Sequence, residues 1–197
     1  MEIDREIAGS QHRAIEKANQ EKNPFARIAE EHSKFTKDDL NITIKYFSSK
    51  DLTKDQQKFC FKLAEKNVSG YYKACSLGWQ PKVKQTDISK NWARFLIAYD
   101  QNKAIGYTMF RFDMDYGRSV IYCYELQIAE GYQKKGLGEF LMKTLESLAK
   151  IWSMNRVVLT LLKNNDGATR FYKRLGYTLD ETSPDDETAY EILSKEF

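Results

Sequence analysis

Two groups of residues have types and spacings that could do chemistry, and the first is a glycine-rich segment. Gly136 and Gly138 follow Lys134 and Lys135 and precede a run with helical spacing. The N-terminus of a helix offers unpaired N–H groups and a partial positive charge, and glycines let a phosphate approach the backbone. The segment predicts a phosphate-binding turn, although an ordinary glycine-rich helix start would explain the two glycines equally well.

The spacing of these glycines excludes the two commonest nucleotide-binding loops. A P-loop has four residues between its glycines, followed by Lys and Ser or Thr, whereas Leu137 alone separates Gly136 from Gly138. A dinucleotide-binding fingerprint needs a third small residue where Leu141 stands, early in a parallel strand–helix–strand unit. What remains is the general chemistry of a helix N-terminus.

The second group centres on Glu125, which interrupts an apolar and aromatic segment. A carboxylate is costly to bury there unless it has a role. A partly buried carboxylate can accept a proton, directly or through water, so Glu125 is our candidate general base. The alternative is a structural partner for a buried Lys or Arg.

Tyrosines and aspartates near Glu125 could bind a substrate. Tyr122 and Tyr124 share one face of the predicted strand, or else pack in the core, and strict alternation places Glu125 on the other face. A β-bulge would be needed to bring all three into one site. Asp113 and Asp115 end the preceding predicted strand, where they could hold a guanidinium or simply face solvent in a turn.

The elements that must position these residues are typical of one mixed domain. Alternating or apolar runs expected to form strands occupy residues 42–47, 93–99, 103–113, 120–128, 156–162, 178–180 and 189–194. Helical spacing or capping signals occupy residues 50–68, 134–152 and 165–176. Short turns between the central strands favour an antiparallel meander. We expect an α/β (α+β) fold with a mixed, mostly antiparallel sheet of about seven strands.

Composition narrows the class of protein. The 197 residues carry 42% hydrophobic residues and a net charge of +3, which favours a globular domain and gives no argument for nucleic-acid binding. Three cysteines without ligand spacing indicate a reducing, intracellular compartment, and nothing predicts a membrane segment. Residues 1–40 are polar and read as a partly helical arm, before a single domain at residues 41–197.

Two motifs together resemble one enzyme family. Gln133-x-x-Gly136-x-Gly138 matches the Gln/Arg-x-x-Gly-x-Gly/Ala loop of the GNAT acetyltransferases, which cradles the pyrophosphate of coenzyme A. Residues 165–177, NDGATRFYKRLGY, are similar to that family's second block, in which the Asn contacts the cofactor. Either motif alone would be a weak signal, but both occur in the right order. The resemblance implies a GNAT fold with acetyl-CoA as cofactor and no metal.

The resemblance also implies a set of cofactor contacts. In the family, the strand before the loop splays from its neighbour, and its exposed backbone binds the thioester and the pantetheine arm. An ordinary core strand would give the same sequence pattern. Carried onto this sequence, the cofactor-binding residues are Leu126, Gln127, Ile128, Gln133, Lys134, Lys135, Gly136, Leu137, Gly138, Glu139 and Asn165.

A narrower resemblance is to the NatD type of N-terminal acetyltransferase, whose substrates are histone tails beginning Ser-Gly-Arg-Gly. It rests on FRFDMD, YCYELQ, GLGEFL, LTLLKNNDGA and YEILS, between about Tyr71 and Ser194. It implies substrate contacts from Tyr72, Asp113, Met114, Asp115, Tyr122, Tyr124, Thr160, Thr182 and Tyr190. The catalytic residues would be Glu125, Tyr124 and Tyr172, with Tyr172 protonating the leaving thiolate. Leu77 departs from the pattern, because a Trp would fit better there.

We therefore expect an Nα-acetyltransferase that lets the free terminal amine attack acetyl-CoA directly, within a ternary complex. Its partners would be histone tails, with no nucleic acid or membrane, and it would act as a monomer without an auxiliary subunit in nucleus and cytoplasm. The alternatives are a GNAT that acetylates lysine side chains or small amines, and a catalytically silent CoA-binding module of chromatin.

Overall fold

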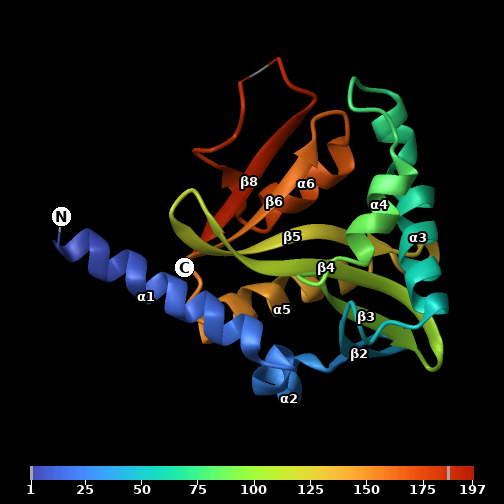
Figure 1. The fold of residues 1–197 in the computed structure, drawn as a ribbon. Coiled ribbons are helices and arrows are strands. Elements are labelled where there is room, and N and C mark those ends of the chain that lie inside the picture. The colour runs from blue at the N-terminus through green and yellow to red at the C-terminus, as the bar shows by residue number, and fades with distance from the viewer. Residues whose placement is uncertain (1, 186) are drawn as a thin grey trace.

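An eight-stranded sheet forms the centre of the molecule (Figure 1). This computed structural model describes residues 2–185 and 187–197. The strands are β1 (Lys34–Lys37), β2 (Leu40–Ser48), β3 (Arg94–Asp100), β4 (Lys103–Asp115), β5 (Arg118–Ile128), β6 (Arg156–Leu162), β7 (Thr178–Leu179) and β8 (Tyr190–Glu196). Their order is β1-β2-β3-β4-β5-β6-β8-β7, and within the described chain every neighbouring pair is antiparallel except the parallel pair β5 and β6. The expected mixed, mostly antiparallel sheet is confirmed.

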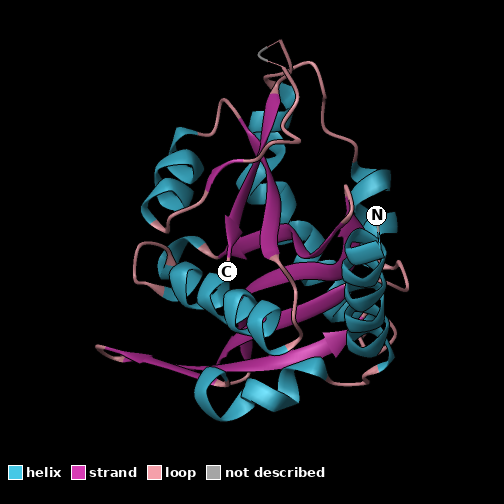
Figure 2. Cartoon of the chain, turned by 90° about the vertical axis from the view of Figure 1, so that its left-hand side faces the viewer, coloured by secondary structure: helices cyan, strands magenta, loops and turns pink. Residues whose placement is uncertain are grey.

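Helices cover both faces of this sheet, as Figure 2 shows. They are α1 (Glu2–Gln20), η1 (Pro24–Ile28), α2 (Ala29–His32), α3 (Lys54–Lys73), α4 (Pro81–Ile88), η2 (Glu130–Tyr132), α5 (Leu137–Ile151) and α6 (Asp166–Arg174). One buried apolar cluster joins α5 to the sheet, and a second joins α3 and α4 to the opposite face. Among the described residues, no helix is long and apolar enough to cross a membrane.

Local sequence explains several of these boundaries. Thr53 caps α3 by accepting from the Gln56 N–H at 3.2 Å, while the Gln56 side chain accepts from the Thr53 N–H at 2.8 Å. The turn between β3 and β4 lies at the predicted position. Between β4 and β5, Tyr116 and Gly117 take φ values of 44° and 78°, the left-handed conformations that a two-residue hairpin turn needs.

The sheet has one strand more than the sequence pattern indicates. β1 is short and polar apart from the buried Phe35, so it carries too little alternation to be recognised. It pairs with β2 through a tight turn in which Asp38 has φ 51°. The expected boundary between residues 40 and 41 therefore falls inside this hairpin.

The N-terminal helix is attached to the sheet by specific hydrogen bonds. Asn19 Nδ2 donates to the Phe112 carbonyl at 3.2 Å, and Arg94 Nη2 donates to the Asn19 carbonyl at 2.9 Å. Nearer the start of α1, Gln11 Oε1 accepts from the Ser119 N–H at 2.8 Å. Because these contacts reach β3, β4 and β5, α1 buttresses the strands that carry the site.

Candidate active site

The sheet opens where β5 and β6 diverge. Their parallel pairing covers Val120–Cys123 of β5 and ends there. β5 continues to Ile128 alongside β4, while β6 continues alongside β8. On its β6 side, the end of β5 therefore offers backbone groups that no strand of the described chain pairs with. This is the splayed edge that the family resemblance implies, and it contains Leu126 and Gln127. The Ile128 carbonyl is already used, because it accepts from Gln133 Nε2 at 2.9 Å and Asn67 Nδ2 at 3.0 Å.

The glycine-rich loop begins α5 in a conformation that leaves its backbone accessible. Gly136 is the N-cap with φ 94°, a left-handed conformation that favours glycine. A Cβ on Gly138 would lie 3.4 Å from Cζ of Phe171 on α6, an ordinary van der Waals contact. Leu137 is fully buried and anchors the turn in the core, while Lys134 and Lys135 are exposed.

A further cation lies over the loop and comes from β1. A Cβ built on Gly136 would lie 3.7 Å from Lys37 Nζ and 3.6 Å from Phe35 Cζ. Lys37 was missed in the sequence because the strand that carries it was not recognised. Glu139, in the first turn of α5, binds Lys143 at 2.8 Å, and this hydrogen bond lowers the pKa of the Glu139 carboxyl. Backbone N–H groups, glycines and cations thus converge on one helix N-terminus.

β5 contains a β-bulge of the kind needed to bring Tyr124 and Glu125 into one site. Met109 pairs with Glu125 and Phe110 pairs with Cys123, so Tyr124 is an extra residue in the ladder. As a result, the consecutive residues Tyr124 and Glu125 line the same small cavity, between the sheet and α4. The cavity measures about 10 Å³, close to the space that one water needs.

Glu125 is held by a chain of polar side chains. It is 9% exposed and forms an ion pair with Lys84 of α4, while Gln127 Nε2 donates to its other carboxylate oxygen at 2.7 Å. Asn67 Nδ2 of α3 in turn donates to Gln127 Oε1 at 3.1 Å. Burial lowers the pKa of Lys84, but Glu125 and the Tyr72 phenol raise it more, so the net pKa is raised and Lys84 stays charged. The ion pair with Lys84 fits the alternative in which Glu125 is the structural partner of a buried lysine. The position of Glu125 on the cavity fits a general base, which needs access to the proton that it accepts.

Three aromatic rings beside Glu125 form what we call the aromatic cage: Trp92, Tyr122 and Tyr124. Tyr124 lies 4.7 Å from Trp92 and 5.0 Å from Tyr122, measured between ring centroids. The Tyr122 hydroxyl forms a 2.6 Å hydrogen bond with Thr160 Oγ1 of β6. The cage thus spans the divergence of β5 and β6. Trp92 was not identified from the sequence, because it lies in a loop without a motif.

Asp113 is not a free carboxylate in this site. Arg111 Nη2 lies 2.5 Å from Asp113 Oδ2, and its guanidinium also contacts the aromatic cage. Met114 lies between Asp113 and Asp115 on β4, and alternation turns its side chain to the other face. Met114 can therefore offer only its backbone to the side where Asp113 lies.

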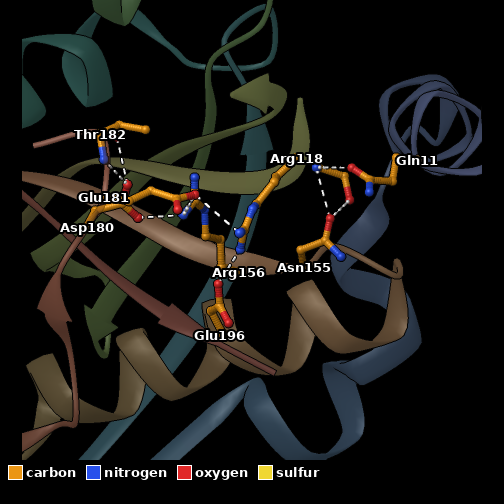
Figure 3. A network of polar contacts seen from close by, with 9 residues as sticks. Gln11, Arg118, Asn155, Arg156, Asp180, Glu181, Thr182 and Glu196 are labelled. Atoms are coloured by element: carbon orange, nitrogen blue, oxygen red, sulfur yellow. Dashed lines mark hydrogen bonds and ion pairs between the residues drawn. The ribbon is translucent and has the colours of Figure 1, made fainter. Parts of the chain in front are cut away.

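Asp115 adjoins a buried network that Figure 3 shows in part. Arg156 is 1% exposed and donates to Asp180 Oδ2 at 2.7 Å, and Thr182 donates to Asp180 Oδ1 through its hydroxyl at 2.7 Å. Burial raises the pKa of Asp115; Arg156 offsets this in part, and Asp180 and Asp113 add to it. Thr182 thus belongs to the buried network of Asp180 and Arg156.

The remaining tyrosines lie around the divergence of the strands. Tyr172 of α6 is buried, and burial, with smaller contributions from Cys123 and Glu125, raises the pKa of its phenol well above the ordinary value. An ordinary phenol is protonated at neutral pH in any case, and the raised pKa makes Tyr172 a weaker proton donor than an ordinary tyrosine. Lys84 Nζ lies 5.1 Å from the centroid of the Tyr72 ring. Tyr190 begins β8 opposite Leu162, which places it on the same face as Thr160.

Asn165 has a structural task that is visible in the fold. Its Oδ1 accepts from the Ala168 N–H at 3.1 Å and so caps α6. The cap fixes the start of the helix that carries Phe171 and Tyr172. Any contact of Asn165 with a cofactor would be additional to this hydrogen bond.

The pattern of the acetyltransferase (GNAT) family matches residues 46–177, from β2 to the residue before β7. The chain belongs to this family. One GNAT relative is the spermine/spermidine N(1)-acetyltransferase of Bacillus subtilis (strain 168), which is 31% identical over 84 residues, 40% of this chain and 55% of the relative. The chain thus spans about half the length of the curated relatives it matches.

Solved GNAT structures share the fold over most of the chain. PaiA N-acetyltransferase from Thermoplasma acidophilum, in complex with coenzyme A, has a TM-score of 0.59 at 16% identity and covers 79% of this chain and 99% of its own. NAA60 from Arabidopsis thaliana, in complex with a bisubstrate analogue, has a TM-score of 0.58 at 13% identity, with the same coverage of both chains. At these identities the likeness shows the fold alone, and the expected GNAT fold is confirmed.

Proposed function

We propose that this chain transfers an acetyl group from acetyl-CoA to the free N-terminal amine of a protein. The observation that carries the proposal is the bulge in β5. It places Tyr124 and Glu125 in one cavity, next to the splayed edge of β5 and on the strand that leads to the Gly136 loop. A base, a peptide-binding tyrosine and a cofactor edge are thereby adjacent.

The residues of the loop fit the pyrophosphate of coenzyme A. The left-handed Gly136 and Gly138, which has no side chain, leave backbone N–H groups at the start of α5 accessible, and Lys37, Lys134 and Lys135 can balance negative charge. Acetyl-CoA, when bound, supplies an activated thioester. The splayed backbone of Leu126 and Gln127 would hold its pantetheine arm as an added strand would.

Glu125 and Tyr172 would handle the protons of the transfer. Glu125, paired with Lys84, would accept one proton from the incoming ammonium, directly or through one water. The amine nitrogen would then bond to the acetyl carbon while the carbon–sulfur bond breaks and Tyr172 donates its phenolic proton to the departing sulfur. The nitrogen would lose its second proton to the phenolate so formed, which restores Tyr172 and leaves the amide and the coenzyme A thiol. The site aligns the amine with the thioester, which is itself a large part of such catalysis.

For the acceptor we propose a basic protein tail that begins Ser-Gly-Arg-Gly, as in the histones. Tyr72, Tyr122, Tyr124 and Tyr190 would bound a narrow entrance, and Asp115 with Thr182 would lie on the peptide side. The resemblance to the NatD type supports this choice. We further propose that the enzyme is monomeric and binds neither nucleic acid nor membrane. A histone acceptor would place it in nucleus and cytoplasm.

A second candidate acceptor is a polyamine. The observation in its favour is the Bacillus subtilis relative, whose name assigns it spermine and spermidine. Carboxylates such as Asp115 would attract either acceptor, so charge alone does not separate the two. The aromatic cage favours a peptide, because tyrosine hydroxyls can bind a peptide backbone and a polyamine has none.

One assay separates the candidates. Labelled acetyl-CoA is offered with a Ser-Gly-Arg-Gly peptide, with the same peptide blocked at its N-terminus and extended by a lysine, and with spermidine. We expect label on the free peptide alone. Equal labelling of the blocked peptide would refute terminal-amine transfer, and label on spermidine alone would favour the polyamine. Coenzyme A binding without any transfer would identify a silent module.

A further inference from the structure

The proton that Glu125 accepts in the proposed reaction must leave the site before the next turnover. An ammonium and a thioester yield an amide, a thiol and one proton, and once Tyr172 is restored this proton remains on Glu125. Glu125 is 9% exposed, and Lys84 and Gln127 Nε2 each contact one of its carboxylate oxygens. Repeated turnover therefore needs a group that takes the proton from Glu125 and passes it to solvent.

Asp87 of α4 is a second carboxylate on the cavity that Glu125 lines. The cavity measures about 10 Å³, close to the space that one water needs, and Asp87 forms part of its wall one helical turn after Lys84. Asp87 is also partly exposed, so it borders the cavity and the solvent together. Within the described chain, no hydrogen bond or ion pair engages its side chain. Its carboxylate is therefore available to accept a proton from the cavity.

The other polar side chains on this cavity are unsuited to carry the proton away. Lys84 keeps its charge, because Glu125 and the Tyr72 phenol raise its pKa, and an ammonium has no lone pair. The Tyr107 hydroxyl is fully buried and donates to the Cys60 carbonyl at 3.0 Å. Burial raises the pKa of the Tyr124 phenol, so that phenol is protonated already.

The position of Asp87 is not explained by the stability of α4. It lies in the last turn of that helix, where the helix dipole favours a cation and disfavours a carboxylate. Burial raises the pKa of the Asp87 carboxyl, Lys84 and Lys90 offset this in part, and Glu125 adds to it. A carboxyl with a raised pKa holds a proton more readily than an exposed one, which suits a group that receives a proton from another carboxyl.

We propose that Asp87 is the proton exit of the active site, which takes the proton of the Glu125 carboxyl through a water in the shared cavity and releases it to solvent. In this step the O–H bond of Glu125 breaks, the water passes one proton on as it receives another, and an O–H bond forms on Asp87. Asp87 then ionises into solvent. The inference rests on the proposed function, because Glu125 must be the base. It holds for a protein terminus and a polyamine alike.

The test is the kcat of Asp87→Asn in dilute buffer, with whichever acceptor the wild type acetylates. We expect kcat to fall by about 10- to 100-fold, because the amide cannot accept a proton. The KM values for acetyl-CoA and acceptor should not change. Added 1-methylimidazole, a proton acceptor without an N–H to acetylate, should restore kcat progressively by replacing the missing carboxylate. Asp87→Glu should retain kcat, and Asp55→Asn, which removes an exposed carboxylate of α3, is the matched control.

Two results would overturn the inference. One is a wild-type kcat for Asp87→Asn in dilute buffer, and the other is a lowered kcat that 1-methylimidazole does not restore, which indicates a structural role. Denaturant unfolding should show no loss of stability, and Asp87→Ala gives the same comparison if the first variant does not fold. A wild type that acetylates no amine refutes the proposed function and the exit together, whereas an active wild type with an unaffected variant refutes the exit alone.

Discussion

Glu125 and Lys84 form a buried ion pair whose two members come from a bulged strand and a short helix. An isolated buried charge is strongly destabilising, whereas a paired one is tolerated. Lys84 therefore makes it possible to keep an ionised carboxylate beside the cavity. The same pair could also serve stability alone, and the two roles differ in what each substitution changes.

Glu125→Gln should lower kcat by about 100-fold or more, because the amide cannot accept a proton. Binding of coenzyme A should be unaffected, since the loop at Gly136 is untouched. Steady-state kinetics and calorimetry measure the two quantities. A variant that binds coenzyme A and retains wild-type kcat and pH profile would refute the assignment of Glu125 as base.

Lys84→Met tests how the lysine acts through Glu125. The raised pKa of Lys84 means that its ion pair contributes stability across the neutral range and loses it only as the pH rises through the folded-state value. Removal of this cation should lower the free energy of unfolding by about 3 kcal/mol or more, because the buried Glu125 carboxylate loses its counter-charge. Lys84→Arg should restore most of this stability. Denaturant unfolding measures the change, and a Lys84→Met protein as stable as the wild type would contradict this role of the pair.

Elements decide which residues meet at the cofactor site. β1 lies at one edge of the sheet, yet it places Lys37 and Phe35 over the turn that begins α5. The start of α5 is therefore covered by a segment about 100 residues earlier in the chain. The bulge in β5 likewise decides which residues meet, because one extra residue turns Glu125 toward α4.

Lys37→Met should weaken coenzyme A binding about two- to fivefold, as expected for one exposed charge beside an anion. The effect should shrink at high salt, and kcat should not change. Lys34→Met, on the same strand and also exposed, is the control. Equal effects of the two substitutions would show that general surface charge is responsible and that the position above Gly136 is not.

At the scale of the whole molecule, α1 is tied to β3, β4 and β5, and the last two of these strands carry site residues. Figure 1 shows the C-terminal part of this helix against the domain, with its first turns projecting beyond it. Arg94 is largely buried and connects α1 with Tyr46 of β2, to which Nη1 donates at 2.6 Å. Asn19 meets both Arg94 and the Phe112 carbonyl, so it is a convenient place to loosen the helix.

Asn19→Ala should lower the free energy of unfolding by about 1 to 2 kcal/mol, because the Phe112 carbonyl loses its partner and Arg94 loses an acceptor. Denaturant unfolding measures this change. The specific activity of the folded fraction should stay the same. Glu16→Ala, on an exposed part of α1, should have little effect, and a similar loss there would contradict specific docking by Asn19.

Much of the fold and the outline of the site were predictable from local sequence. Hydrophobic alternation located the central strands, helical spacing located α5, and the Gly136 and Asn165 motifs indicated the family that residues 46–177 then matched. Such signals lie within a few residues of one another, so they are readable without a three-dimensional arrangement. The short polar strand β1 and the helix α4 lacked them.

The chain itself determined which chemical groups are available: a carboxylate within an apolar strand, tyrosines beside it, a glycine-rich helix start and an acidic strand end. Tertiary structure decided the partners of those groups. Lys84 of α4 took Glu125 of β5, and Lys37 of β1 reached the turn at Gly136. The physical reason is that a buried charge is stabilised by an opposite charge that lies close in space. The sequence pattern does not show which distant cation the folded chain brings close.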